Sequence, residues 1–175
     1  MLKIILIALV GIVAVILIYA ATRPDSFQVQ RTVSIKASAD KIFPQINDFH
    51  NWVAWSPYEK IDPNMKKTYT GPESGKGTVY EWEGNRMVGK GRMEIIDSLA
   101  PNKIVLKLDF DKPIEGHNIV EFTLSPSGDT TEVTWAMSGR TAYVAKIVGI
   151  FVSMDHMIGK EFATGLNNLK ALTQK

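Results

Sequence analysis

The chain has 175 residues, of which 45% are hydrophobic and 22% charged, a balance typical of a globular domain with one core and unlike that of a disordered chain. Lys3 and Arg23 flank the first apolar run, and beyond them 18 Lys and Arg stand against 18 Asp and Glu, so a basic face for nucleic acid is not expected. The lack of cysteine excludes disulfides, thiolate catalysis and cysteine-ligated zinc.

Residues 4–21 form an apolar run without a charge. At about 1.5 Å per residue, a helix of this length reaches roughly 27 Å, close to the thickness of a bilayer's hydrocarbon core. A cleaved signal peptide is the alternative, but Ile18 and Tyr19 would occupy the −3 position, where small residues are required. We therefore expect residues 1–23 to be an uncleaved anchor, with the membrane as a partner through residues 4–21. The short N-terminal tail favours an extracytoplasmic globular domain.

The first strand and the first helix of the domain follow a Pro-containing joint. Residues 27–37 alternate between apolar and polar side chains, which predicts a half-buried strand. Residues 38–49 have helical spacing behind Ser38 or Asp40 as N-cap, and Pro44 requires that this helix begin near Asp40 or be kinked. The next stretch, DFHNWVAWSPYEK (48–60), is rich in aromatics without a regular period. We interpret it as chiefly structural, with Trp55 and Tyr58 at the edge of a cavity.

Short alternating or apolar runs separated by Gly, Pro, Asn and Asp predict six more strands. These runs are residues 65–70, 78–84, 89–97, 103–110, 118–125 and 131–139. The tight turn SPSGD, residues 125–129, predicts antiparallel pairing of the last two. With the first strand, the expected sheet has about seven strands.

Residues 141–175 carry apolar side chains at steps of three and four, which predicts one long amphipathic helix. The apolar stripe consists of Val144, Ile147, Val148, Phe151, Met154, Ile158, Phe162, Leu166 and Leu169. The first half is apolar nearly all round, with Lys146 as its single charge before Asp155. We expect this half to be buried on several sides, to touch lipid or to close over a cavity.

Motifs for nucleotides, metals and nucleophiles are incomplete. In GNRMVGKG, residues 84–91, Gly91 stands where Ser or Thr should bind magnesium, and a strand follows instead of a helix, so we interpret it as a hairpin loop. His50, His117 and His156 lack a paired ligand spacing, and no G-x-S-x-G motif is present. We therefore expect no cofactor and no metal, and the motifs identify no catalytic residue.

Several segments resemble the START-like (SRPBCC) superfamily, in its polyketide cyclase/dehydrase-like branch. They are ASADKIFPQINDFHNWVAWSPYEK, GKGTVYEWEG, GKGRMEI, TEVTWAMSG and SMDHMIGKEFATGLNNLKAL, and the resemblance covers about residues 25–175. It implies an α+β helix-grip fold, in which a curved antiparallel sheet of about seven strands surrounds a long C-terminal helix and encloses a hydrophobic cavity. We thus expect a transmembrane anchor at 1–23 and a START-like ligand-binding domain at 24–175. The superfamily has no universal catalytic set.

The leading hypothesis is a membrane-anchored domain that binds a lipid or another hydrophobic small molecule in an internal cavity. Residues 142–154 would form a lid, and His117 or Glu121 would orient a polar headgroup. Aromatic side chains would supply the wall and polar handles, namely Trp55, Tyr58, Tyr80, Trp82 and Trp135.

A second hypothesis is a cyclase- or dehydratase-type enzyme acting on an apolar substrate, with His117 or a buried carboxylate as acid or base. A third is an interaction module whose apolar helix docks a partner protein. A void of a few hundred Å³ would favour the two ligand hypotheses over the third.

Overall fold

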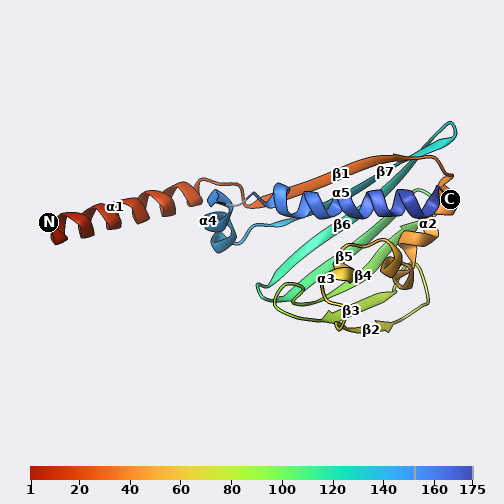
Figure 1. Cartoon of the computed structure of the whole chain (residues 1–175), viewed down its shortest axis with the longest axis horizontal. Coiled ribbons are helices and arrows are strands. Elements are labelled where there is room, and N and C mark those ends of the chain that lie inside the picture. The colour runs from red at the N-terminus through yellow and green to blue at the C-terminus, as the bar shows by residue number, and fades with distance from the viewer. Residues whose placement is uncertain (152, 175) are drawn as a thin grey trace.

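A seven-stranded antiparallel sheet curves around helix α5 (Met154–Thr173) in the computed structural model, which describes residues 1–151 and 153–174 (Figure 1). The strands are β1 (Ser26–Ile35), β2 (Lys66–Thr70), β3 (Val79–Glu83), β4 (Lys90–Leu99), β5 (Lys103–Lys112), β6 (Gly116–Ser127) and β7 (Thr130–Arg140). The other helices are α1 (Leu2–Ala21), α2 (Ala39–Asn47), the 3₁₀ helix η1 (Phe49–Ala54), α3 (Tyr58–Ile61) and α4 (Tyr143–Phe151).

The sheet order is β1-β7-β6-β5-β4-β3-β2, so the first strand of the domain lies beside the last. β1 pairs with β7 over its whole length, from Ser26 opposite Arg140 to Ile35 opposite Thr131. β6 and β7 are joined by a two-residue turn at Gly128 and Asp129, where Gly128 has a φ of 62° that other residues adopt with strain. The α+β helix-grip prediction and the hairpin predicted at residues 125–129 are confirmed.

The core lies between the concave face of the sheet and α5. Alternate residues of the central strands point inward because side chains on a strand alternate between its two faces. The buried side chains include Ile104, Leu106, Val120, Phe122, Leu124, Val133 and Trp135 from the sheet, and Phe162, Leu166 and Leu169 from α5. Full burial of one such side chain contributes about 1.5–3 kcal/mol, so the packing of α5 on the sheet is a major source of stability.

The aromatic side chains of residues 48–60 lie mostly in the core, as the sequence indicated: Phe49, Trp52 and Trp55 are buried, and Tyr58 packs against the core. Trp52 in η1 and Trp55 at the end of η1 are both buried. Trp52 donates its indole N–H to the carbonyl of Ile46 (2.9 Å), and Trp55 donates its indole N–H to the carbonyl of Gln45 (2.8 Å). The last carbonyls of a helix have no partner within it, so the two tryptophans satisfy the C-terminal end of α2. The stretch therefore joins α2 to the core through hydrogen bonds as well as packing.

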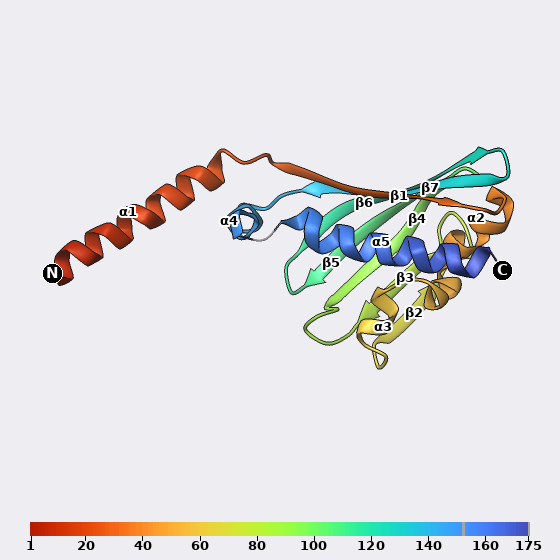
Figure 2. The ribbon, with the colours of Figure 1, turned by 45° about the horizontal axis from the view of Figure 1, so that its top comes forward.

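The prediction of one continuous C-terminal helix is wrong. α4 ends at Phe151, and α5 begins at Met154 with Ser153 as N-cap, whose hydroxyl accepts a hydrogen bond from the backbone N–H of His156 (3.3 Å). Val152 and the side chains of Phe151 and Met154 lie outside the described parts of the chain. The cap separates a long helix held by the sheet from a short one that packs against α1 (Figures 1 and 2).

Helix α1 projects from the domain on the side of α4 (Figures 1 and 2). Its segment Lys3–Ala21 is long and apolar enough to cross a membrane and is only 6% buried against the rest of the chain. Within the described residues it is the one helix with these properties.

Candidate functional site

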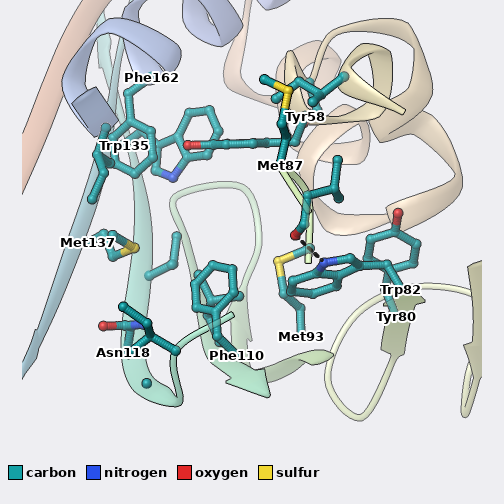
Figure 3. A pocket seen from close by; sticks show the side chains of 18 of the residues that line it. Tyr58, Tyr80, Trp82, Met87, Met93, Phe110, Asn118, Trp135, Met137 and Phe162 are labelled. Atoms are coloured by element: carbon teal, nitrogen blue, oxygen red, sulfur yellow. Dashed lines mark hydrogen bonds between the residues drawn. The ribbon is translucent and has the colours of Figure 1, made fainter. Parts of the chain in front are cut away.

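A cavity of about 440 Å³ lies between the sheet, α5 and the segment that contains η1 and α3 (Figure 3). This volume is within the range of small-molecule sites, which runs from about 300 to 1,000 Å³. Its wall is formed mainly by aromatic side chains, methionines and aliphatic side chains. The residues labelled in the close-up are Tyr58, Tyr80, Trp82, Met87, Met93, Phe110, Asn118, Trp135, Met137 and Phe162.

The side of the cavity nearest α5 is built on a stacked pair. The rings of Trp135 on β7 and Phe162 on α5 lie 4.1 Å apart at an interplanar angle of 11°. Gly165 makes this approach possible, because a Cβ there would stand 2.8 Å from Trp135 and 3.0 Å from Pro57. On the opposite side the ring of Trp82 meets Phe110 edge-on at 5.6 Å. Two aromatic pairs thus fix the width of an apolar space.

Three polar groups that border the cavity lack a hydrogen-bond partner among the described residues. The indole N–H of Trp135 is buried without an acceptor. The Tyr58 hydroxyl and the side-chain amide of Asn118 also line the cavity, and neither makes a hydrogen bond within the described chain. Burial raises the pKa of Tyr58, and the negative charge of Glu161 raises it further, so the hydroxyl stays protonated. The cavity therefore offers at least two free hydrogen-bond donors, the Trp135 indole N–H and the Tyr58 hydroxyl, in mainly apolar surroundings.

A buried carboxylate, which the sequence did not single out, occupies the wall near α3. Glu59 accepts a hydrogen bond from the Tyr80 hydroxyl at Oε1 (2.8 Å) and pairs through Oε2 with the ammonium of Lys67 on β2. Burial and this hydrogen bond raise the pKa of Tyr80. The Tyr80 ring stacks on that of Tyr69 at 5.1 Å. Because both oxygens of Glu59 are engaged, the cluster acts as a fixed polar end of the wall and not as a free base.

Four of the seven predicted site residues line the cavity together: Tyr58, Tyr80, Trp82 and Trp135. Trp55 does not line it. It is fully buried, and its ring contacts that of Trp135 edge-on at 5.5 Å, so it supports the wall from behind.

His117 and Glu121 lie on the outer face of β6, because the inward positions of that strand are taken by Asn118 and Val120. His117 contacts Asp109 at 2.7 Å, and this hydrogen bond raises the pKa of the imidazole. Glu121 pairs with Lys103 at 2.9 Å. The structure does not bring these two side chains to the cavity. The inward polar residue at this end of β6 is Asn118, one position from His117, and strand alternation alone could have pointed to it.

The beginning of the predicted lid borders the cavity. Ala142, before α4, and Ala145 within it are part of the lining. Ile158, at the start of α5, lines the cavity on the same side as Phe162 because the two are four residues apart on one helix. Among the described residues, the predicted lid at 142–154 thus contributes Ala142 and Ala145 to the lining, and α5 contributes Ile158 and Phe162.

A comparison with protein-family models matches residues 26–174 to the family described as polyketide cyclase / dehydrase and lipid transport. No curated protein is significantly similar to the chain in sequence.

Many solved structures are similar to the chain in fold. Three of them have sequence identities of 13% or 14%. A Chromobacterium violaceum protein has a TM-score of 0.60 at 13% identity, covering 87% of this chain and 99% of that one. The Aha1 dimer from Colwellia psychrerythraea has a TM-score of 0.60 at 14% identity, covering 85% and 96%. Ginseng major latex-like protein 151 from Panax ginseng has a TM-score of 0.59 at 13% identity, covering 87% and 100%. These likenesses show the fold alone, and with the family match they confirm the START-like resemblance.

Proposed function

The chain belongs to the polyketide cyclase / dehydrase and lipid transport family, and from that premise we propose that its domain, residues 24–175, binds a hydrophobic small molecule or lipid in the 440 Å³ cavity, with residues 1–23 as membrane anchor. The observation that carries the proposal is the buried, unpartnered indole N–H of Trp135 in a mainly apolar wall. A buried donor without an acceptor costs about 1–3 kcal/mol, and a ligand that supplies an acceptor recovers this cost.

The wall chemistry specifies what the ligand should look like. Aromatic and methionine side chains favour an apolar body, since each buried CH₂ contributes roughly 0.8 kcal/mol. The free donors of Trp135 and Tyr58 favour one polar group that accepts hydrogen bonds, such as a carbonyl, carboxyl or ether oxygen. Apolar burial would supply most of the affinity, and the donors would set the orientation.

The first experiment asks what the cavity holds. The full-length chain is purified in detergent, and the ligands that remain bound are identified by native mass spectrometry and by extraction. The Met137→Trp variant, which places an indole into the cavity from β7, should lose the bound species, whereas Val53→Trp, at an exposed position outside the cavity, should keep it. A cavity that stays empty with fatty acids, phospholipids and aromatic polyketides, or equal occupancy in both variants, would contradict the proposal.

The role of the free donors is tested with Tyr58→Phe. This change removes one hydroxyl and keeps the ring, so we expect binding to weaken about 2- to 10-fold, the equivalent of one hydrogen bond. The thermal unfolding midpoint should change little, because the hydroxyl has no partner among the described residues. A large loss of stability with unchanged affinity would assign Tyr58 to the core instead.

Membrane anchoring has its own test. The mass of the purified protein shows whether residues 1–23 are retained, and extraction of membranes with alkaline carbonate shows whether α1 is integral. The accompanying hypothesis, an extracytoplasmic domain, is tested with Leu99→Cys. The chain has no cysteine of its own, so this exposed residue alone would react with a membrane-impermeant maleimide on intact cells. Labelling only after lysis would place the domain inside.

A further inference from the structure

Helix α4 is attached to the end of α1. The hydroxyl of Tyr143, the first residue of α4, donates a hydrogen bond to the backbone carbonyl of Leu17 in α1 (2.7 Å). Leu17 lies four residues before Ala21, where α1 ends. At about 1.5 Å per residue, the contact is roughly 6 Å inside the end of the apolar helix.

The linker between α1 and β1 is bound to the same helix. Lys146, the single charged residue of α4, is buried and pairs with Asp25 of the linker. This hydrogen bond and the charge of the ammonium lower the pKa of Asp25. The backbone N–H of Thr141 donates to the carbonyl of Asp25 (2.8 Å). The charge of α4 is thus turned toward the linker. Two contacts join α4 to α1 and to the linker, and a third joins the linker to Thr141 just before α4.

The open face of α4 is apolar. Val144 and Val148, one helical turn apart, are 61% and 51% exposed. The neighbouring tip between β5 and β6 exposes Ile114, which also lines the cavity together with Ala142. The tip and α4 are at the same end of the sheet, since β6 begins there and β7 ends there. Exposed apolar side chains of α4 and of the β5–β6 tip therefore lie at one end of the sheet, beside residues that line the cavity. Helix α1 leaves the domain on the side of α4 (Figure 2).

We propose that α4 lies in the interface of the bilayer that α1 spans, with Val144 and Val148 in contact with lipid, so that the cavity opens directly onto the membrane. A helix in this position is typically buried about 5–10 Å into the boundary between headgroups and acyl chains, which matches the depth of about 6 Å set by the contact with Leu17. The pairing of Lys146 with Asp25 leaves no uncompensated charge on α4 to oppose this. A hydrophobic ligand would then pass between bilayer and cavity beside α4 without entering bulk water.

The occupant proposed for this face is the bilayer and not a second protein, because the face is continuous with the membrane-spanning helix. The inference rests on the proposed anchoring of α1 but not on the occupancy of the cavity. A failure of ligand binding would therefore leave it intact, and a failure of docking would leave the cavity proposal intact.

The test uses the absence of native cysteine. Single variants Val148→Cys and Val53→Cys of the full-length chain are labelled with the polarity-sensitive fluorophore NBD and reconstituted in phosphatidylcholine vesicles, with and without spin-labelled lipids that carry the quencher near the headgroup. The two valines form a matched pair, since they are 51% and 52% exposed and Val53 lies in η1, away from α4. The fluorophore at position 148 should emit at shorter wavelength and be quenched several-fold more strongly than at position 53.

Equal spectra and equal quenching at the two positions would overturn the proposal. A blue shift at position 148 without quenching by the spin-labelled lipids would also overturn it, because it would mean that protein covers α4. Loss of the chain from the vesicles in alkaline carbonate would remove the anchoring on which the proposal depends, and so would overturn it as well. Val144→Cys provides a second position on the same face and should behave like Val148→Cys.

Discussion

Removing the ammonium of Lys67 should leave the buried carboxylate of Glu59 without its charged partner. Lys67→Met keeps the length and apolar stem of the side chain but deletes the ammonium that pairs with Glu59. The side chain of Glu59 is 5% exposed, so the carboxylate would retain only the hydrogen bond from Tyr80. Deleting one partner of a buried ion pair costs about 3–5 kcal/mol. Because the side chain of Lys67 is 24% exposed and water can approach, we expect the lower end, about 3 kcal/mol.

The assay is thermal unfolding of the detergent-solubilised chain, followed by circular dichroism. For a domain of this size each kcal/mol lowers the midpoint by about 2–4 °C, so Lys67→Met should unfold about 6–12 °C below the parent. The matched control is Lys36→Met, which removes a surface pair with Asp129 in which the side chains are 73% and 75% exposed. This change should cost less than about 1 kcal/mol.

A second substitution isolates the charge as the cause. Glu59→Gln added to Lys67→Met removes the unpaired negative charge of Glu59 and keeps an oxygen that accepts the hydrogen bond from Tyr80. The double variant should therefore be more stable than Lys67→Met alone. The reasoning would be refuted by a Lys67→Met midpoint no lower than that of Lys36→Met, or by a double variant that is no more stable than the single one.

Three further predictions concern the supports of the cavity and its outer face. Trp52→Ala should lower the free energy of unfolding by about 3–5 kcal/mol, since Trp52 is buried and hydrogen-bonded to α2; a loss below 1 kcal/mol in urea titration would contradict this. Gly165→Ala should destabilise by about 1–3 kcal/mol despite better helix propensity, because its Cβ would meet two side chains, whereas Gly149→Ala, with open space around it, should stabilise by up to about 1 kcal/mol. The pKa of His117 measured by NMR should lie above 6.5 and fall in Asp109→Asn. Because the folded pKa is raised, the stability that this pair contributes is present below about pH 6.5 and is lost as the pH rises through the folded pKa. An unchanged imidazole pKa in the variant would contradict the assignment of Asp109 as the cause.

The strands and their buried faces could be predicted because the relevant pattern is local. In β3, Tyr80 and Trp82 alternate with the exposed Glu81 and Glu83. This alternation of aromatic and charged side chains predicts which face of the strand points into the core. The same holds for residues 27–37 of the first strand and for the apolar run of α1, whose length and lack of charge can be read from the residues themselves. The helix-grip arrangement then followed from the family resemblance.

The polar residues of the site could be predicted only in part. His117 or Glu121 was predicted to orient a polar headgroup, but the phase of β6 puts Asn118 and not its neighbour His117 into the cavity. Glu59 was missed because its importance depends on Lys67 and Tyr80, which lie on other elements. No spacing within residues 48–60 encodes those partners.

The sequence by itself determined the apolar helix at the N-terminus, the strand order along the chain and the inward-facing aromatic residues, since periodicity and composition act over a few neighbouring positions. Tertiary structure decided where the C-terminal helix breaks, which polar groups meet in the cavity, and that Tyr143 binds Leu17 and Lys146 binds Asp25. Residues in those last pairs are more than 120 positions apart, and their contacts exist only once the sheet has brought the end of β7 beside the start of β1. Local patterns carry no information about such encounters, because they depend on the closure of the whole fold.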